Sequence, residues 1–185
     1  MKQNNELLQI MQDYVQFMDS DKTINLPVVV SEHKKNHPSS LYYVSALTSV
    51  FPFGETKFDC EIRDRDVLSY SFQIRSDKFK GQVALRFDEG DAAHRNDLPG
   101  LPLDQQSVTT PHFHRYNEQG YLIAYKNEEL NAVAQTSLGI EDGFDIFLRE
   151  AKIGRTVAVP LIKISENGII QMNLQQTDPL AGVNF

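Results

Sequence analysis

Three consecutive segments alternate apolar and polar residues, and this period of two limits the possible folds more than any other feature of the chain. The segments are Lys57–Arg63, Val67–Arg75 and Lys80–Asp88. Successive side chains of a β-strand point to opposite faces, so each segment predicts a strand with one buried face. The links between the segments are short, so we expect neighbouring strands to pair antiparallel as a meander.

Two helices are expected around these strands. In the N-terminal segment 1–22, Leu7, Met11, Tyr14 and Met18 recur at helical spacing and predict a helix over Asn5–Asp19. A shorter helix is predicted over Gly139–Ala151, with its phenylalanines facing inward. Each helix has an apolar stripe that must be buried, and a sheet is the natural surface for both.

Further strands are predicted on both sides of the meander. Leu26–Val30 and the stretch from Leu41 onward have strand-like composition, whereas Ser31–Ser40 reads as a polar loop. Val157–Ile164 and Gly168–Leu174 flank an Asn-Gly pair, which is a strong hairpin signal.

The pattern as a whole predicts a single α+β domain over residues 1–185. We expect a curved antiparallel sheet, built as a meander plus hairpins, with the N-terminal helix and the shorter helix against it. Residues 97–108 contain prolines and a glycine and are expected to form a loop, and residues 175–185 are expected to form a loosely held tail.

Composition excludes several classes of protein. Cys60 is the only cysteine, so neither an internal disulfide nor a cysteine-rich zinc site can form. The net charge of −7 opposes non-specific binding to DNA. No segment is long and apolar enough to predict a signal peptide or a membrane span, so we expect a cytoplasmic protein.

The stretch Thr109–Tyr125 is the strongest candidate for a functional site. His112, His114 and Tyr116 alternate with Phe113 and Arg115, so on a strand the two imidazoles and the phenol share one face. A four-residue loop over 117–120 would close a hairpin in which residue 116 faces 121, 114 faces 123 and 112 faces 125.

Other polar residues precede this hairpin. Arg86 and Asp88 lie two positions apart and point to the same side of the third strand of the meander. A surface ion pair is the plain explanation for them. His33 and His37 have a spacing that would suit a metal on a helix, but Pro38 argues against a helix, so we interpret them as part of a solvated loop.

The order of these motifs resembles an uncharacterised bacterial domain family. Arg86-Phe87-Asp88, His94-Arg95-Asn96 and Pro111-His112-Phe113-His114-Arg115-Tyr116 are similar to its R-x-D strand, P-H-x-N-P turn and P-H-x-H-x-Y hairpin. Ala92-Ala93 and Asp97-Leu98-Pro99 depart from the pattern around the turn. The resemblance implies site roles for Arg86, Asp88, His94, Asn96, His112, His114 and Tyr116. It implies no established activity, only mobile-element and toxin-like gene contexts.

Three chemical hypotheses remain open for these residues. The first is metal-free cleavage of RNA, in which imidazoles transfer protons and an arginine stabilises charge. Such a protein needs no cofactor. The residues assigned to catalysis are His94, His112, His114, Arg86 and Tyr116. The residues assigned to binding are Asp88, Arg95, Asn96 and Arg115.

The alternatives differ in class. One is a non-enzymatic binding or inhibitor module with a protein partner, in which the histidines are structural or form a binding face. The other is a metal site, in which His112 and His114 together with His94 or Asp88 hold Zn, Mn or Fe. A serine-centred elbow, a phosphate-cradling glycine loop and a dinucleotide fingerprint are all missing from the sequence, which removes the commonest enzyme classes.

Overall fold

The computed structural model describes residues 3–63, 69–80, 82–90, 92–98, 100–133, 137–154, 161–166 and 169–171. The helices among them are α1 (Asn5–Gln9), α2 (Met11–Asp19), α3 (Glu128–Ala132) and α4 (Ile140–Glu150), with 3-10 turns η2 (Asp77–Phe79) and η3 (Leu103–Gln105). The strands of the main sheet are β3 (Glu32–Lys34), β4 (His37–Ala46), β6 (Thr56–Ile62), β7 (Tyr70–Ser76), β8 (Val83–Glu89), β11 (His112–Tyr116) and β12 (Leu122–Tyr125). The other strands are β1 (Lys22–Thr23), β2 (Val28–Val30), β5 (Thr48–Ser49), β9 (His94–Arg95), β10 (Ser107–Val108), β13 (Ile162–Glu166) and β14 (Ile169–Gln171).

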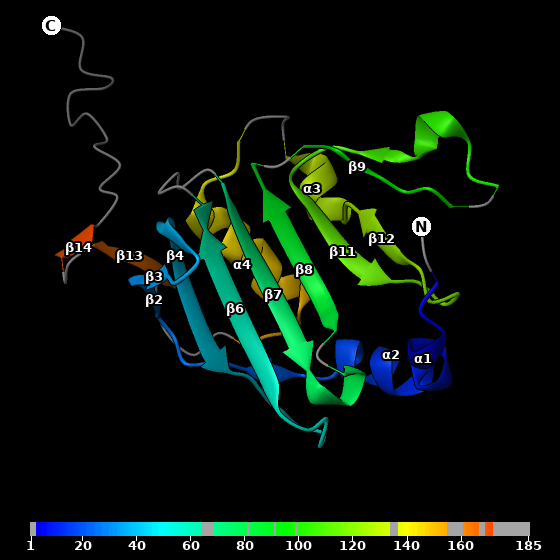
Figure 1. Cartoon of the computed structure of the whole chain (residues 1–185), viewed down its shortest axis with the longest axis horizontal. Coiled ribbons are helices and arrows are strands. Elements are labelled where there is room, and N and C mark those ends of the chain that lie inside the picture. Colours follow the sequence, from blue (N-terminus) through cyan, green and yellow to red (C-terminus); the bar gives the residue numbers. More distant parts are fainter. Residues whose placement is uncertain are drawn as a thin grey trace, which may run out of the picture.

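The main sheet has seven antiparallel strands in the order β12-β11-β8-β7-β6-β4-β3 (Figure 1). β6, β7 and β8 form the meander expected from their alternating residues, with Phe58 opposite Ile74 and Phe72 opposite Phe87. The predicted α+β class is therefore confirmed, as are the antiparallel sheet and the shorter helix, which is α4.

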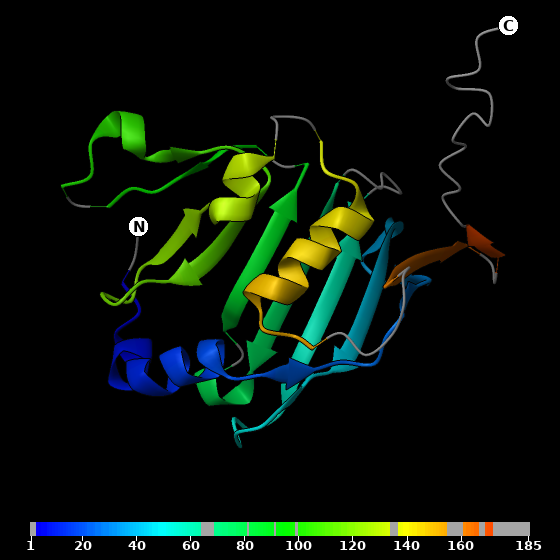
Figure 2. The same ribbon diagram turned by 180° about the vertical axis from the view of Figure 1, so that it is seen from behind.

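One face of the sheet carries the hydrophobic core. α4 lies across this face (Figure 2), and its Phe144 and Phe147 rings lie 5.1 and 5.4 Å from the Phe72 ring between centroids. Four neighbouring strands of the sheet each contribute one fully buried phenylalanine, namely Phe58, Phe72, Phe87 and Phe113. Aromatic side chains bury a large apolar area each, so this cluster contributes strongly to stability through apolar burial.

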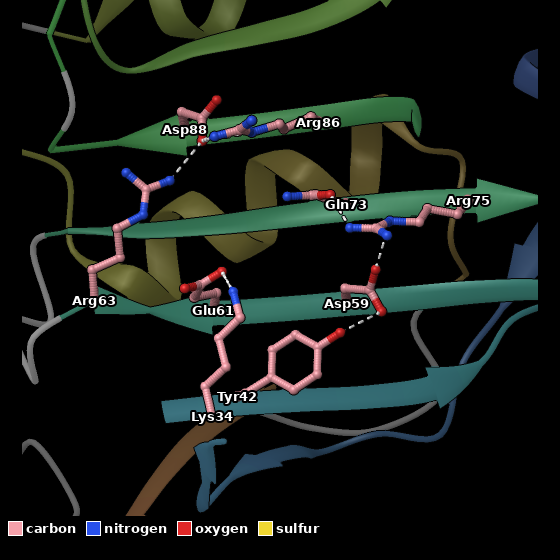
Figure 3. Close-up of polar contacts among 9 residues, drawn as sticks. All are labelled: Lys34, Tyr42, Asp59, Glu61, Arg63, Gln73, Arg75, Arg86 and Asp88. Atoms are coloured by element: carbon pink, nitrogen blue, oxygen red, sulfur yellow. Dashed lines mark hydrogen bonds and ion pairs between the residues drawn. The ribbon is translucent and has the colours of Figure 1, made fainter. Parts of the chain in front are cut away.

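The opposite face of the sheet is polar and carries paired charges (Figure 3). Arg75 contacts Asp59 at 3.0 Å, and Lys34 contacts Glu61 at 2.7 Å. These side chains come from the alternate positions of the strands whose other residues form the core. Except for Arg115, the candidate site residues on β8 and β11 lie on this face, so the meander that buries the aromatic residues also positions the site.

The N-terminal helix is not continuous, contrary to expectation. Ile10 leaves the helical conformation, with φ −121° and ψ 24°, and separates α1 from α2. α1 is tied to the hairpin loop through Asn4, whose backbone N–H donates to Gly120 O at 2.9 Å. α2 instead places Phe17 against Phe53 and Phe79. The break lets each half pack on its own surface, and neither proline nor glycine marks it in the sequence.

Residues 31–40 form strands, so the prediction of a polar loop was wrong there. β3 and β4 pair as a hairpin with an irregular register after His33, and β4 begins at His37. Pro38 is tolerated because β4 pairs with β6 only from Leu41 onward, so its missing N–H breaks no bond of that ladder. His33 and His37 are both exposed.

The β11–β12 hairpin forms, but its predicted register was wrong by one residue. Tyr116 pairs with Leu122 and His114 with Ala124, so the loop has one more residue than expected. Gly120 adopts φ +74°, a left-handed conformation that favours glycine and commonly adds a residue to such a turn. Asn117 stabilises this loop because its Oδ1 accepts from the N–H of Tyr121 at 2.9 Å.

The C-terminal strands are confirmed where they are described. β13 pairs antiparallel with β14 and parallel with β2, and this small sheet has the order β14-β13-β2. The beginning and end of the predicted strands, the Asn-Gly pair, the link at 64–66 and the tail at 175–185 lie outside the described residues.

The short helix α3 was not predicted. Among the described helices, none has the length and apolar character needed to cross a membrane.

Gly143 provides a test of how closely α4 packs on the sheet. A Cβ at this position would overlap the Tyr70 hydroxyl and lie 2.9 Å from its Cζ. We expect Gly143→Ala to lower the free energy of unfolding by about 1–3 kcal/mol through overpacking, although alanine is the better helix former by about 1 kcal/mol. Urea denaturation measures the change.

Tyr70→Phe in the same background is the matched control. It removes the hydroxyl that the new methyl group meets, so the double variant should lose less stability than the sum of the two single variants. A Gly143→Ala protein as stable as its parent would show that α4 does not lie this close to Tyr70.

Candidate functional site

The site is built on the register between β8 and β11. His112 pairs with Asp88 and His114 pairs with Arg86, so two candidates from each strand lie directly opposite one another. All four side chains lie on the polar face, because alternate residues of these strands, Phe87 and Phe113, enter the core. The H-x-H and R-x-D spacings put the members of each pair on one face, as the sequence predicted, and the register between β8 and β11 brings the two pairs together.

The two hairpin histidines are buried and touch each other. His112 Nε2 lies 2.8 Å from His114 Nε2, and the two side chains belong to residues that are 2% and 7% exposed. His114 Nε2 also lies 3.2 Å from Asp88 Oδ2. Three atoms that can each donate a lone pair thus converge at one point of the site.

Asp88 is held from the other side by arginines. Its Oδ1 accepts from Arg86 Nε at 2.8 Å and Arg86 Nη2 at 2.7 Å, and Arg63 Nη2 lies 3.4 Å away (Figure 3). Burial acts to raise the pKa of Asp88, but the His114 hydrogen bond and the Arg86 charge outweigh it and hold the pKa below its usual value. Asp88 is therefore a carboxylate at neutral pH.

His94 joins the cluster from a separate segment. Its ring centroid lies 4.7 Å from that of His114 and 6.1 Å from that of His112. Burial, followed by the neighbouring His114, lowers the pKa of His94. Burial likewise lowers the pKa of His112 to about 4, with His114 as the second cause. Both rings are neutral at pH 7 as a result.

Asn96 explains why His94 stands over the sheet. Its Nδ2 donates to Ala124 O at 2.7 Å, and its Oδ1 accepts from the Ala124 N–H at 2.8 Å. The side-chain amide thus pairs with the backbone of β12, which is an edge strand. The predicted loop at 97–108 folds back through η3, and its β10 pairs with β9, so His94 is fixed to the rim of the site.

The cluster opens into a cavity, which we call the histidine pocket. Its volume is about 310 Å³, and Arg86, Asp88, His94, His112 and His114 line it together with Val83, Ala92, Ala93 and Leu122. A second cavity of about 660 Å³, here called the amide cavity, shares His94 and Leu122 with it. Its other lining residues are Gln3, Asn4, Asn5, Glu6, Gln82 and Tyr116.

The remaining candidates lie outside the histidine pocket. Tyr116 lines the amide cavity and bonds Gln82 Oε1 at 3.3 Å through its hydroxyl. Arg95 bonds Gln106, and Arg115 lies over the Tyr125 ring on the other side of β11. Asn96 acts in folding, as described above. His33 and His37 are at the far end of the sheet order, on β3 and β4.

Arg63 is a site residue that the sequence did not single out. It follows β6, two strands away from Asp88 in the sheet order, and reaches the carboxylate diagonally. Its place on the polar face followed from alternation, but its partner depends on the register of two strand pairs. Leu122, on β12, was not singled out either. It lines the histidine pocket because the hairpin register differs by one residue from the predicted register.

Searches against protein-family models, curated proteins and solved structures find no match. The resemblance to a bacterial domain family stays a prediction, and the function must be inferred from the site itself.

Asn96→Ala tests the attachment of the β9–β10 segment. The substitution leaves the N–H and carbonyl of Ala124 without their partner, and a lost buried hydrogen bond costs about 1–3 kcal/mol. We expect faster amide hydrogen exchange over residues 94–108, with the core strands β6 and β7 still protected. Arg95→Ala, on the same short strand, should change exchange much less. Equal protection in Asn96→Ala and the parent would contradict this role.

Proposed function

We propose that the protein cleaves phosphodiester bonds of RNA in the histidine pocket. The observation that supports this most is the meeting of three histidines, one carboxylate and an arginine in one cavity, from β8, β9 and β11. Titratable side chains with shifted pKa values that converge in a cavity are typical of active sites.

Arginine charge supports an anionic substrate. Arg86, which lines the histidine pocket, and Arg63 both contact Asp88, so two guanidinium groups lie at the same carboxylate. A phosphodiester entering the histidine pocket would meet the Arg86 guanidinium, and guanidinium groups stabilise the charge that develops on phosphoryl oxygens.

The amide cavity supports a nucleotide rather than a simple phosphate ester. Asn4, Asn5 and Gln82 offer side-chain amides, and Tyr116 offers a ring and a hydroxyl. Amides hydrogen-bond the edges of bases, and aromatic rings stack on their faces. Because the two cavities share His94 and Leu122, a base in the amide cavity would place its phosphate toward the histidine pocket.

His94 is the best placed general base. Its Nε2 is buried and has no hydrogen-bond partner among the described residues, and its lowered pKa keeps it neutral. It would accept the proton of a ribose 2′-hydroxyl. The 2′-oxygen then bonds to phosphorus, the bond from phosphorus to the 5′-oxygen breaks, and that oxygen takes a proton from solvent. A phosphoryl group does not fit between His112 and His114, whose Nε2 atoms are 2.8 Å apart.

A short fluorogenic RNA tests the proposal. The parent protein should cleave it to products ending in a 2′,3′-cyclic phosphate, and His94→Ala should lower the rate by about 10²–10⁴-fold. An otherwise identical oligonucleotide with 2′-deoxyribose at every position should stay intact. Assays with added Mn²⁺ and with chelator keep the outcome independent of any metal requirement.

His33→Ala is the matched control, because this exposed histidine lies far from the pocket in the sheet order. It should cleave at the parental rate. An RNA that the parent protein leaves intact, or equal rates for His94→Ala and the parent, would reject the proposed reaction. RNA or protein binding without turnover would support the alternative of a binding module. In a toxin-like role, expression of the parent but not of His94→Ala would slow bacterial growth.

A further inference from the structure

We propose that Asp88, His112 and His114 bind one divalent transition-metal ion, through Asp88 Oδ2 and the Nε2 atoms of both histidines. Among the described residues these three form a group whose ligand atoms all lie within 4.8 Å of one another. Binding of the ion stands on this geometry alone. Its participation in catalysis would rest on the RNA cleavage proposed above.

The distances suit ligands of a single ion. His112 Nε2 lies 2.8 Å from His114 Nε2, which lies 3.2 Å from Asp88 Oδ2. Two ligands at right angles, with metal bonds of about 2.1 Å, are separated by about 3 Å. Two histidines and one carboxylate on one side of an ion, with the other positions open, form a known arrangement for non-haem iron and related metals.

The backbone already places these ligands. His112 and His114 are alternate residues of β11, and Asp88 is the direct partner of His112 on β8. All three are buried, at 2%, 7% and 2% exposure for His112, His114 and Asp88. Side chains fixed by sheet pairing and burial lose little freedom when an ion binds, which favours binding.

The arginines act as the outer support of the carboxylate ligand. Arg86 occupies Asp88 Oδ1 with two N–H groups, at 2.8 and 2.7 Å, and Arg63 approaches the same oxygen. Oδ2 is the oxygen that faces His114. Groups that hold the outer oxygen of a ligating carboxylate orient the inner one and tune its affinity for metal.

Counting protons gives an independent reason for a cation. Each neutral imidazole has one N–H, so His114 Nε2 cannot donate to Asp88 and accept from His112 at the same time. If His114 Nε2 carries the proton, it has no lone pair with which to accept from His112; if it does not, its lone pair faces a lone pair of Asp88 Oδ2. His114 Nδ1 is buried without a hydrogen-bond partner among the described residues, so the cluster is not a satisfied structural network. A metal ion accepts all three lone pairs.

The ligand set indicates the class of metal. Two imidazole nitrogens and one carboxylate suit Zn²⁺, Mn²⁺ or Fe²⁺, whereas Mg²⁺ and Ca²⁺ prefer oxygen ligands throughout. The histidine pocket, of about 310 Å³, leaves room for water or substrate at the open positions. A bound ion would stabilise negative charge on a phosphoryl oxygen.

Calorimetric titration of tag-free, chelator-treated protein with Zn²⁺, and separately with Mn²⁺, tests the site. We expect one ion per chain for at least one metal. Asp88→Asn and His114→Gln should each abolish that binding step. Arg86→Gln should weaken it by about 10–100-fold, as expected for a residue that supports a ligand. Circular dichroism checks that each variant is folded.

The double variant His33→Ala/His37→Ala is the control, since these exposed histidines would account for adventitious binding. It should bind as the parent does. Visible absorption of bound Co²⁺ in the parent protein gives a second readout that needs no variant. Absence of a stoichiometric binding step, or its loss in the control variant alone, would overturn the proposal.

The two proposals fail separately. Stoichiometric metal binding without RNA cleavage would uphold the metal site and reject the RNA reaction. RNA cleavage by a protein that binds neither Zn²⁺ nor Mn²⁺ and keeps its rate in chelator would reject the metal site and uphold the reaction.

Discussion

The buried carboxylate of Asp88 is the interaction on which the polar face of this protein depends. A charge at 2% exposure is costly unless other groups compensate for it. Arg86, Arg63 and His114 all supply that compensation at one residue. Because these partners come from β8, from the end of β6 and from β11, Asp88 joins parts of the sheet that are distant in sequence. Removing its charge would take away a partner that Arg86, Arg63 and His114 share.

The site and the core are two consequences of one strand pattern. On β8 and β11, Phe87 and Phe113 point to the side of α4, and the residues beside them carry the imidazole, carboxylate and guanidinium groups. Aromatic packing fixes the strands, and the strands fix the spacing of the ligand atoms. The α+β fold therefore gives the histidine pocket a rigid floor, while β9 supplies His94 from a segment attached through Asn96.

Much of this could be predicted from local patterns. Alternation identified β6, β7 and β8, and the spacing of His112 and His114 placed both on one face. Their partners Arg86 and Asp88 followed from the same rule, although direct contact depended on a register that no local signal fixes. The metal-ligand arrangement was one of the sequence-based hypotheses, but the 2.8 Å contact between the two rings is what favours it over a pair that exchanges protons with substrate.

What could not be predicted depends on contacts between distant residues. Arg63 reaches Asp88 only because two strand pairs set their registers. The break at Ile10 separates α2 from α1, which is bonded to the hairpin loop at Gly120. The hairpin register differs from the predicted one because Gly120 adopts a left-handed conformation and the Asn117 side chain accepts a hydrogen bond within the loop. The strands at 31–40 look polar because that hairpin lies at the edge of the sheet, where its side chains are exposed.

Anomalous diffraction from crystals soaked in Mn²⁺ or Co²⁺ would test the proposed metal site directly. We expect one strong peak in the histidine pocket, about 2.0–2.2 Å from the Nε2 atoms of His112 and His114 and from Asp88 Oδ2. A pocket without a peak, with the two imidazoles still in direct contact, would contradict it, as would a peak found only beside the exposed His33 and His37.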